Sequence, residues 1–190
     1  MQVDVRKPGQ VTLCDIKVYK TPAGNSLWLV FVDAATNHAV VELLTTKSSP
    51  NICEAVDQYL VKMGQFVHRG DFYSDSEATF LAKANIEHLI RNGQRPIVLE
   101  ASPPYIQQLN GKVERIAGVI NKMADCMDQQ FVSQLGDLGE THLAKISLMA
   151  FKHAAEIFNR LSPARGGKSS NELLYSRVSP HNELRVFWKS

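Results

Sequence analysis

Residues 102–115 read SPPYIQQLNGKVER, a run of turn-forming and amide side chains that leads into a helical pattern. A short apolar run at 97–99 precedes it and is typical of a strand. After Gly111, apolar residues recur at helical spacing at Val113, Ala117, Ile120, Ala124 and Met127. The pattern predicts that Glu114 lies in the first turn of a helix beside a sheet edge, where the helix dipole favours an ionised carboxylate. A lone glutamate at a helix start usually has no further role, so its meaning depends on other acidic residues.

Two aspartates in strand-like runs change the interpretation of Glu114. Asp15 lies within the apolar run 11–18, VTLCDIKV, and Asp75 closes the run 72–75, FYSD. A carboxylate inside a hydrophobic strand is costly to bury unless a partner compensates its charge, and a divalent metal ion is such a partner. Two aspartates from strands and one glutamate from a helix, meeting at one sheet edge, would give the oxygen ligands that Mg²⁺ prefers. A pair of such ions roughly 3.5–4 Å apart drives in-line phosphoryl displacement.

The loop and the three carboxylates resemble the catalytic core of a retroviral-type integrase, of the kind encoded by copia-type LTR retrotransposons. The family's loop reads PYTPQQNGVAER, and residues 104–115 match it at Pro104, Tyr105, Gln108, Asn110, Gly111, Glu114 and Arg115. Asp15 and Asp75 stand where the family has its aspartates, and Glu114 follows Asp75 by 39 positions, close to the family's spacing. The tail runs FNRL, NELLY and ELRVF, at 158–161, 171–175 and 183–187, resemble the family's N-R-L, Y-E-L-W and L-R-V-F. The likeness covers about residues 11 to 188.

This resemblance implies DNA 3′-end processing and strand transfer that depend on Mg²⁺ or Mn²⁺. It implies that Asp15, Asp75 and Glu114 are the catalytic residues and hold two metal ions. It also implies contacts to DNA from the loop and the helix start, at Tyr105, Gln108, Asn110, Lys112 and Arg115. The expected partners are the element's DNA ends, target DNA and further copies of the chain, with no membrane. The expected location is the nucleus, reached through cytoplasmic virus-like particles.

Departures from the family pattern support an alternative of a different class. The family's Asn-Gly-Gly-Glu after the second aspartate is replaced by SEAT at 76–79, and the basic residues expected after Arg115 are replaced by IAG at 116–118. The alternative is a catalytically inactive, integrase-derived domain that binds DNA or other integrase subunits. A plain ribonuclease H-type nuclease is a third hypothesis, but the loop and the C-terminal runs are integrase features.

Bulk composition sets wider bounds on the fold and on the partners. The 190 residues are 44% hydrophobic, which is enough for one well-buried core. A net charge of +2 and a pI near 8.4 permit nucleic-acid binding without indicating it, so phosphate contacts would come from a local patch or from other domains. No apolar run approaches the roughly 20 residues that span a bilayer, and the N-terminus lacks a signal-peptide pattern. A soluble intracellular protein is expected.

Cysteine and histidine spacings predict no zinc or disulfide site in this chain. Cys14, Cys53 and Cys126 are far apart and odd in number, so we expect buried, small hydrophobic side chains. None of the six histidines pairs at the spacing of a zinc knuckle. Integrases of the family carry a zinc domain before the core, and this chain is expected to begin after it.

The order of periodic runs predicts an α/β fold. Strands are expected at 11–18, 27–33 and 38–44, followed by a helix that begins at 49–51 and ends at about 63. A strand at 70–75, a helix at 77–91 and a strand at 96–100 come next. This order predicts a ribonuclease H-like fold, with a five-stranded mixed sheet of three antiparallel and two parallel strands flanked by helices. The expected divisions are a leader at 1–10, the catalytic core at 11–130 and a C-terminal helical extension at 131–190.

Two further segments are interpreted without a functional role. Asp33 ends a strand before a turn, where aspartate usually stabilises the turn, although a metal-ligand role is the competing hypothesis. The run RGGKSS at 165–170 is expected to be a flexible basic loop, because it lacks the spacing and the preceding strand of a phosphate-binding loop.

Overall fold

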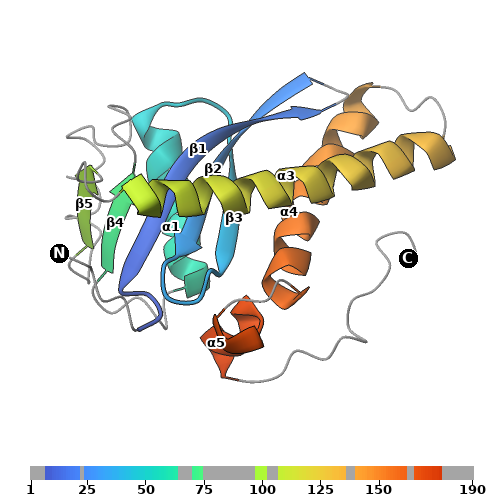
Figure 1. Cartoon of the computed structure of the whole chain (residues 1–190). Coiled ribbons are helices and arrows are strands. Elements are labelled where there is room, and N and C mark those ends of the chain that lie inside the picture. The colour runs from blue at the N-terminus through green and yellow to red at the C-terminus, as the bar shows by residue number, and fades with distance from the viewer. Residues whose placement is uncertain are drawn as a thin grey trace.

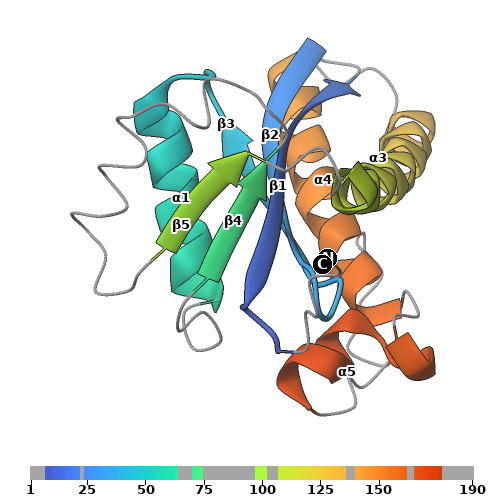
Figure 2. The same cartoon turned by 60° about the vertical axis from the view of Figure 1, so that its left-hand side comes forward.

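A mixed sheet with helices on both faces organises the chain (Figure 1). The computed structural model describes residues 7–21, 24–63, 70–74, 97–101, 107–135, 140–161 and 165–176. Helix α1 (Ser49–Met63) covers one face of the sheet, and helices α3 (Gln107–Leu135) and α4 (Glu140–Leu161) cover the other, as Figure 2 shows.

Five strands form the sheet in the order β3-β2-β1-β4-β5, with bounds β1 Val11–Thr21, β2 Gly24–Asp33, β3 Ala39–Leu44, β4 Gly70–Ser74 and β5 Ile97–Ala101. The first three follow one another along the chain and pair antiparallel. β4 and β5 are added in parallel on the other side of β1, where Ser74 pairs with Cys14 and with Ala101. The predicted meander followed by parallel strands is confirmed, and β1 is the central strand.

The larger part of the core lies between the sheet and helices α3 and α4. Alternate residues of β1 face these helices, so Val11, Leu13 and Tyr19 are buried on one side of the strand. The apolar stripe of α3 that meets them has helical spacing and consists of Val113, Ile116, Ala117, Ile120 and Ala124. From α4, Phe151 stacks on Trp28 of β2 with ring centroids 4.6 Å apart. Helix α4 therefore belongs to the same core as the sheet.

The opposite face of the sheet packs on α1. The other alternate residues contribute here, with Cys14 of β1 and Phe31 of β2 buried against the helix. Tyr59 of α1 stacks on Phe31 at a centroid distance of 4.4 Å, and its hydroxyl lies 3.0 Å from Thr12 Oγ1. Each face of β1 thus has its own helical cover.

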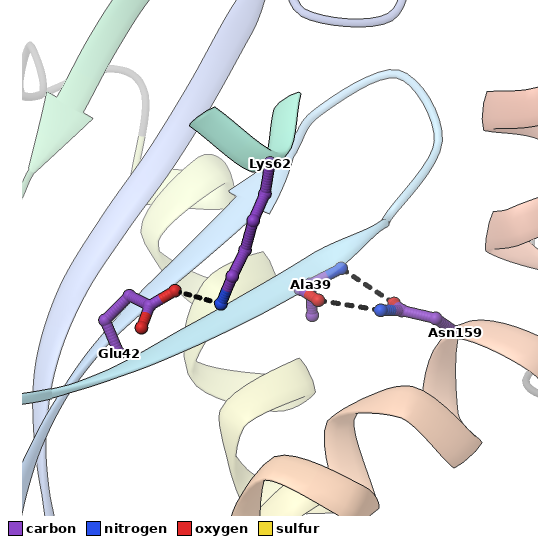
Figure 3. A network of polar contacts seen from close by, with 4 residues as sticks. All are labelled: Ala39, Glu42, Lys62 and Asn159. Carbon is purple, nitrogen blue, oxygen red and sulfur yellow. Dashed lines mark hydrogen bonds and ion pairs between the residues drawn. The ribbon is translucent and has the colours of Figure 1, made fainter. Parts of the chain in front are cut away.

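Polar side chains tie both helical layers to β3 (Figure 3). The Asn159 amide of α4 accepts a hydrogen bond from Ala39 N at 2.8 Å and donates one to Ala39 O at 2.7 Å. On the same strand, the buried carboxylate of Glu42 pairs with Lys62 of α1. A buried carboxylate needs such a partner, and the pair links α1 to the strand.

Helix α3 differs from the expectation at both ends. It begins at Gln107, so Glu114 lies two turns inside the helix and not in its first turn. Gly111 was expected to precede the helix, but an interior glycine costs only about 1 kcal/mol relative to alanine, and the buried stripe of α3 outweighs that. The helix also runs through residue 130, where the core was expected to give way to an extension.

The segment expected to be a flexible basic loop has regular structure. Arg165–Gly167 forms a 3₁₀ turn, in which Gly166 and Gly167 adopt φ of 70° and 76°, the left-handed region that glycine tolerates. Helix α5 (Ser170–Tyr175) follows, and its N-cap Ser169 exchanges hydrogen bonds with Glu172 in a capping box. The run Ser-x-x-Glu at 169–172 is the sequence signature of this cap and predicts a helix start.

The remaining expectations concern the cysteines, two segments of the chain and membrane-spanning helices. Cys14 and Cys53 are buried as predicted, but Cys126 is exposed on the outer side of α3, so its predicted burial was wrong. The helix expected at 77–91 and the tail run at 183–187 lie outside the described residues. Within the part of the chain that the structure describes, no helix is both long and apolar enough to span a membrane.

Candidate active site

Asp15 lies on the central strand, on the face covered by α3. It shares this face with Leu13 and Val11, two and four residues before it in the strand, whose side chains are buried in the core beneath that helix. The Asp15 side chain is only 7% exposed. The ladder between β1 and β4 ends at the pair Cys14 and Ser74, so Asp15 is the first residue of β1 past the end of β4. A carboxylate at this point lies where a parallel strand stops, which is the usual place for ligand-binding side chains in α/β sheets.

Glu114 reaches the same place from the helix. It follows Val113, whose side chain is buried against β1, and its own side chain is 62% exposed. Helical geometry directs neighbouring residues about 100° apart, so the burial of Val113 places Glu114 at the margin of the interface between α3 and the sheet.

Lys17 connects the two carboxylates. Its Nζ lies 2.5 Å from Asp15 Oδ2 and 4.0 Å from Glu114 Oε1. The two oxygens are therefore at most 6.5 Å apart, the sum of these two distances. Lys17 is two residues from Asp15 on the same strand, which directs both side chains to one face of the sheet. The arrangement is a cation held between two acidic groups from different elements.

The neighbouring thiol does not take part in this site. Burial, followed by the negative charge of Asp15, raises the pKa of Cys14 well above its usual value. Cys14 also points to the opposite face of the sheet, where it packs in the core around α1. It therefore remains a neutral, apolar side chain and not a thiolate ligand.

The expected DNA contacts are placed unevenly. Tyr105 lies outside the described residues, as does Asp75, the third expected metal ligand, and Gln108 lies in the first turn of α3. Asn110 is half-buried and Arg115 is exposed. Lys112 donates from Nζ to the carbonyl oxygen of Ala34 at 2.6 Å, so in this structure its ammonium joins α3 to the end of β2. Burial lowers the pKa of Lys112.

Asp33 stabilises a turn, as its position after a strand predicted. Its Oδ1 accepts a hydrogen bond from Gly9 N at 2.7 Å, and its Oδ2 accepts from Thr36 N and Thr36 Oγ1 at 2.8 Å and 2.7 Å. Oδ2 thus stabilises the turn between β2 and β3, while Oδ1 holds the segment before β1.

The donor set at Asp15 and Glu114 fits a hard divalent cation. Both residues offer carboxylate oxygens, which Mg²⁺ and Mn²⁺ prefer, and a cationic group already lies between them. Among the described residues, which do not include Asp75, no three His, Cys, Asp or Glu side chains gather closely enough to hold a metal ion. A complete site would need at least one more ligand.

Lys17 is the site residue that sequence reasoning missed. The signal was available, because a residue two positions from Asp15 in a strand must share its face. The metal site was predicted from acidic residues alone, so Lys17 was not included among the predicted site residues.

The fold of this chain is similar to that of several solved structures. No family model and no curated protein matches the chain. A simian T-cell lymphotropic virus intasome, solved in complex with PP2A regulatory subunit B56 gamma, contains a chain that matches with a TM-score of 0.70 and 15% identity. The match covers 100% of this chain and 60% of that one. This chain thus spans less than two thirds of the length of the intasome chain.

Two isolated catalytic core domains match along almost their full lengths. The HTLV-2 integrase catalytic core in complex with magnesium has a TM-score of 0.62 and 18% identity, over 88% of this chain and 97% of that chain. The catalytic core of BIV integrase has a TM-score of 0.64 and 15% identity, over 88% and 95%. At this level of identity the likeness concerns the fold, so the predicted mixed α/β, ribonuclease H-like architecture is confirmed as that of retroviral integrase cores.

Proposed function

We propose that this chain is an integrase catalytic core, of the kind found in copia-type LTR retrotransposons, that trims DNA 3′ ends and joins them to target DNA. The observation that carries the proposal is the meeting of Asp15 and Glu114 around one cationic group, at most 6.5 Å apart by the sum of the two distances to Lys17 Nζ. These residues are 99 positions apart in the sequence, and the fold shared with integrase cores brings them together.

Asp75 is proposed as the third carboxylate. It directly follows Ser74, which pairs with Cys14, and Cys14 directly precedes Asp15. Asp15, Asp75 and Glu114 would hold two Mg²⁺ or Mn²⁺ ions, and the HTLV-2 core was solved in complex with magnesium. Bound divalent ions would supply activation of the attacking oxygen and neutralisation of charge at the leaving oxygen.

DNA is the proposed substrate, as both element end and target. Arg115 is exposed directly after Glu114, where a guanidinium would reach a phosphate of DNA held at the carboxylates. Tyr105, Gln108, Asn110 and Lys112 are proposed as further contacts, with Lys112 first releasing the Ala34 carbonyl. Assembly with further copies is also proposed, since one matching structure is an intasome and the HTLV-2 core was solved in dimeric and trimeric forms. A nuclear location after virus-like particles remains part of the same proposal.

The test replaces each carboxylate by its amide in the full chain. Asp15→Asn, Asp75→Asn and Glu114→Gln are each expected to abolish Mg²⁺-dependent nicking and joining of oligonucleotide duplexes to a supercoiled plasmid, a loss of at least about 100-fold for a group that acts in the transition state. The exposed Glu54 on α1, across the sheet, provides a matched control as Glu54→Gln, which is expected to keep full activity. Circular dichroism would establish that each variant is folded. Retained joining in any one variant removes that residue from the catalytic role.

A second candidate function is an inactive integrase-derived domain that binds DNA or other subunits. The Lys17 ammonium favours it, because it already compensates both acidic groups and lets them lie together without a metal ion. Calorimetric titration with Mg²⁺ and Mn²⁺ separates the two functions. Binding at millimolar concentrations or tighter supports a catalytic core, whereas DNA binding without metal binding supports the inactive domain.

A further inference from the structure

Lys17 occupies the position between the acidic groups that a metal ion would need. Its Nζ is 2.5 Å from Asp15 Oδ2, a short charge-assisted contact, and 4.0 Å from Glu114 Oε1. The strand fixes the side chain on this face, and 34% of it is exposed to solvent. The ammonium therefore has both a strong partner at the site and room to leave it.

From this geometry we infer that Lys17 is an internal counter-ion that holds Asp15 and Glu114 together in the metal-free protein and competes with divalent metal ions for them. The inference rests on the proposed function, because it concerns the same carboxylates. Two carboxylates with one ammonium carry one net negative charge instead of two, which weakens the attraction for a divalent ion at close range. Metal binding then requires the Lys17 side chain to swing toward solvent.

Asp15 explains why such a counter-ion is present. Its side chain is 7% exposed, and an ionised carboxylate at that depth is costly unless an opposite charge or hydrogen-bond donors compensate it. Lys17 supplies that charge from the same strand when no metal ion is bound. The protein can thus fold with the site assembled before any metal ion binds.

Calorimetric titration of Mn²⁺ into the metal-free full chain tests the competition. Lys17→Gln removes the charge and is expected to bind Mn²⁺ about tenfold more tightly or better. Lys17→Arg keeps the charge and is expected to match the wild type. Lys20→Gln removes an exposed charge from the opposite face of the same strand, and it is also expected to leave the affinity unchanged. A lysine with only a structural role would not tighten metal binding when it is removed.

A second measurement uses the wild-type protein and therefore does not depend on the folding of a variant. Limited modification with an amine-reactive reagent, read by mass spectrometry, would compare Lys17 with Lys20 in EDTA and in saturating Mn²⁺. The modification rate of Lys17 is expected to rise several-fold when Mn²⁺ binds, while that of Lys20 stays constant. An unchanged rate at Lys17 overturns the inference.

The outcomes separate this inference from the proposed function. If the wild type and Lys17→Gln bind Mn²⁺ with equal affinity, the metal site stands and the role of Lys17 is overturned. If Lys17→Gln binds Mn²⁺ and the wild type does not, the competition is supported in its strongest form. If neither protein binds Mn²⁺ at millimolar concentrations, the metal site fails, and both the proposed catalytic function and the competition by Lys17 are overturned.

Discussion

At the scale of single residues, the buried carboxylates differ in how their charge is compensated, and this difference affects stability. Asp15 has a lysine beside it, whereas Asp128 on α3 has a neutral partner, the Tyr19 hydroxyl, which donates to Asp128 Oδ2 at 2.9 Å. Burial raises the pKa of Asp128, and hydrogen bonds from Tyr19 and Ser147 offset part of that rise. Among the described residues, Asp128 Oδ1 has no hydrogen-bond partner of good geometry.

Asp128→Asn is therefore expected to stabilise the protein at neutral pH. A carboxyl group whose pKa is raised in the folded state favours folding below its unfolded pKa, and that contribution is lost as the pH rises through the folded value. The amide keeps an oxygen for Tyr19 and carries no charge, so the variant should melt at a higher temperature than the wild type at pH 7. The difference should shrink as the pH falls toward 4. Melting curves across this range, with Glu54→Gln as the control for loss of one exposed charge, measure it; a variant that is less stable at pH 7 contradicts the argument.

Residue-scale chemistry was also where the sequence was hardest to interpret. Asp15 and Glu114 were predicted to meet at one sheet edge, and the structure places both carboxylates beside Lys17, while their catalytic role stays a prediction. Strand alternation places Lys17 on the same face as Asp15, but the sequence pattern does not give the contact that Lys17 makes across to Glu114 on the helix.

At the scale of elements, Asn159 gives α4 a polar contact with β3, in addition to the apolar packing between them. Asn159 is buried, and its amide reproduces a backbone pairing with both polar groups of Ala39 (Figure 3). The resemblance to the family's N-R-L run included this residue without a physical reason. The structure gives one, because a side-chain amide offers an acceptor and a donor side by side and so pairs with both the N–H and the C=O of Ala39.

Asn159→Asp is expected to destabilise the protein by about 2–4 kcal/mol, because it leaves the Ala39 carbonyl facing a carboxylate oxygen in a buried place. Asn159→Ala is expected to lose about 2 kcal/mol, since two hydrogen bonds disappear. The matched control is Asn121→Ala on α3, where the amide reaches Asp125 at 3.3 Å in a half-buried position. Urea unfolding monitored by circular dichroism gives these values. Equal stability of Asn159→Asp and the wild type would show that the pairing does not hold α4.

Element boundaries show what local pattern can and cannot predict. The strands and α1 begin and end within a few residues of their predicted bounds, because apolar alternation and turn residues are local signals. The start of α3 was misplaced because Asn110 and Gly111 are typical of a helix boundary, while the packing that overrides them comes from β1, about 100 residues earlier.

At the scale of the whole molecule, one core joins elements from both ends of the chain. Phe151 and Phe158 of α4 are buried with Val11 and Leu13 of β1, so the predicted catalytic segment and its C-terminal extension share one interior. The sequence predicted the mixed α/β class from the order of its periodic runs. It did not show that the final helices complete the core, since periodicity describes each helix alone and not the surface it meets.

The stability of the whole molecule is expected to fall in acid because of His38. This side chain is buried in the turn between β2 and β3, near Tyr175 of α5, with ring centroids 6.1 Å apart. Burial lowers the pKa of His38 to about 4, against a partial rise from a hydrogen bond with Asn171. A histidine with a lowered pKa contributes stability that is complete above its unfolded pKa near 6.5 and is lost as the pH falls toward 4.

The wild type is therefore expected to lose up to about 3 kcal/mol between pH 6.5 and pH 4 from this one group. His38→Gln carries no titratable group at this position and should flatten that part of the pH profile, while the exposed His142→Gln should follow the wild type. Urea midpoints at several pH values measure the slopes. Parallel profiles for the wild type and His38→Gln would show that another group governs acid sensitivity.

The strand order β3-β2-β1-β4-β5 has a consequence for how the molecule reaches its native state. The first three strands close through short hairpins, but the parallel neighbour of β1 must arrive from far along the chain, and such long-range pairings form slowly. While the polypeptide emerges from the ribosome, the edge of β1 next to Asp15 stays unpaired until β4 has been made. Glu114 reaches Asp15 only once the first turns of α3 have formed. The pairing of Asp15 with Glu114 thus forms late in folding, and a nascent chain that has not yet formed the first turns of α3 lacks it.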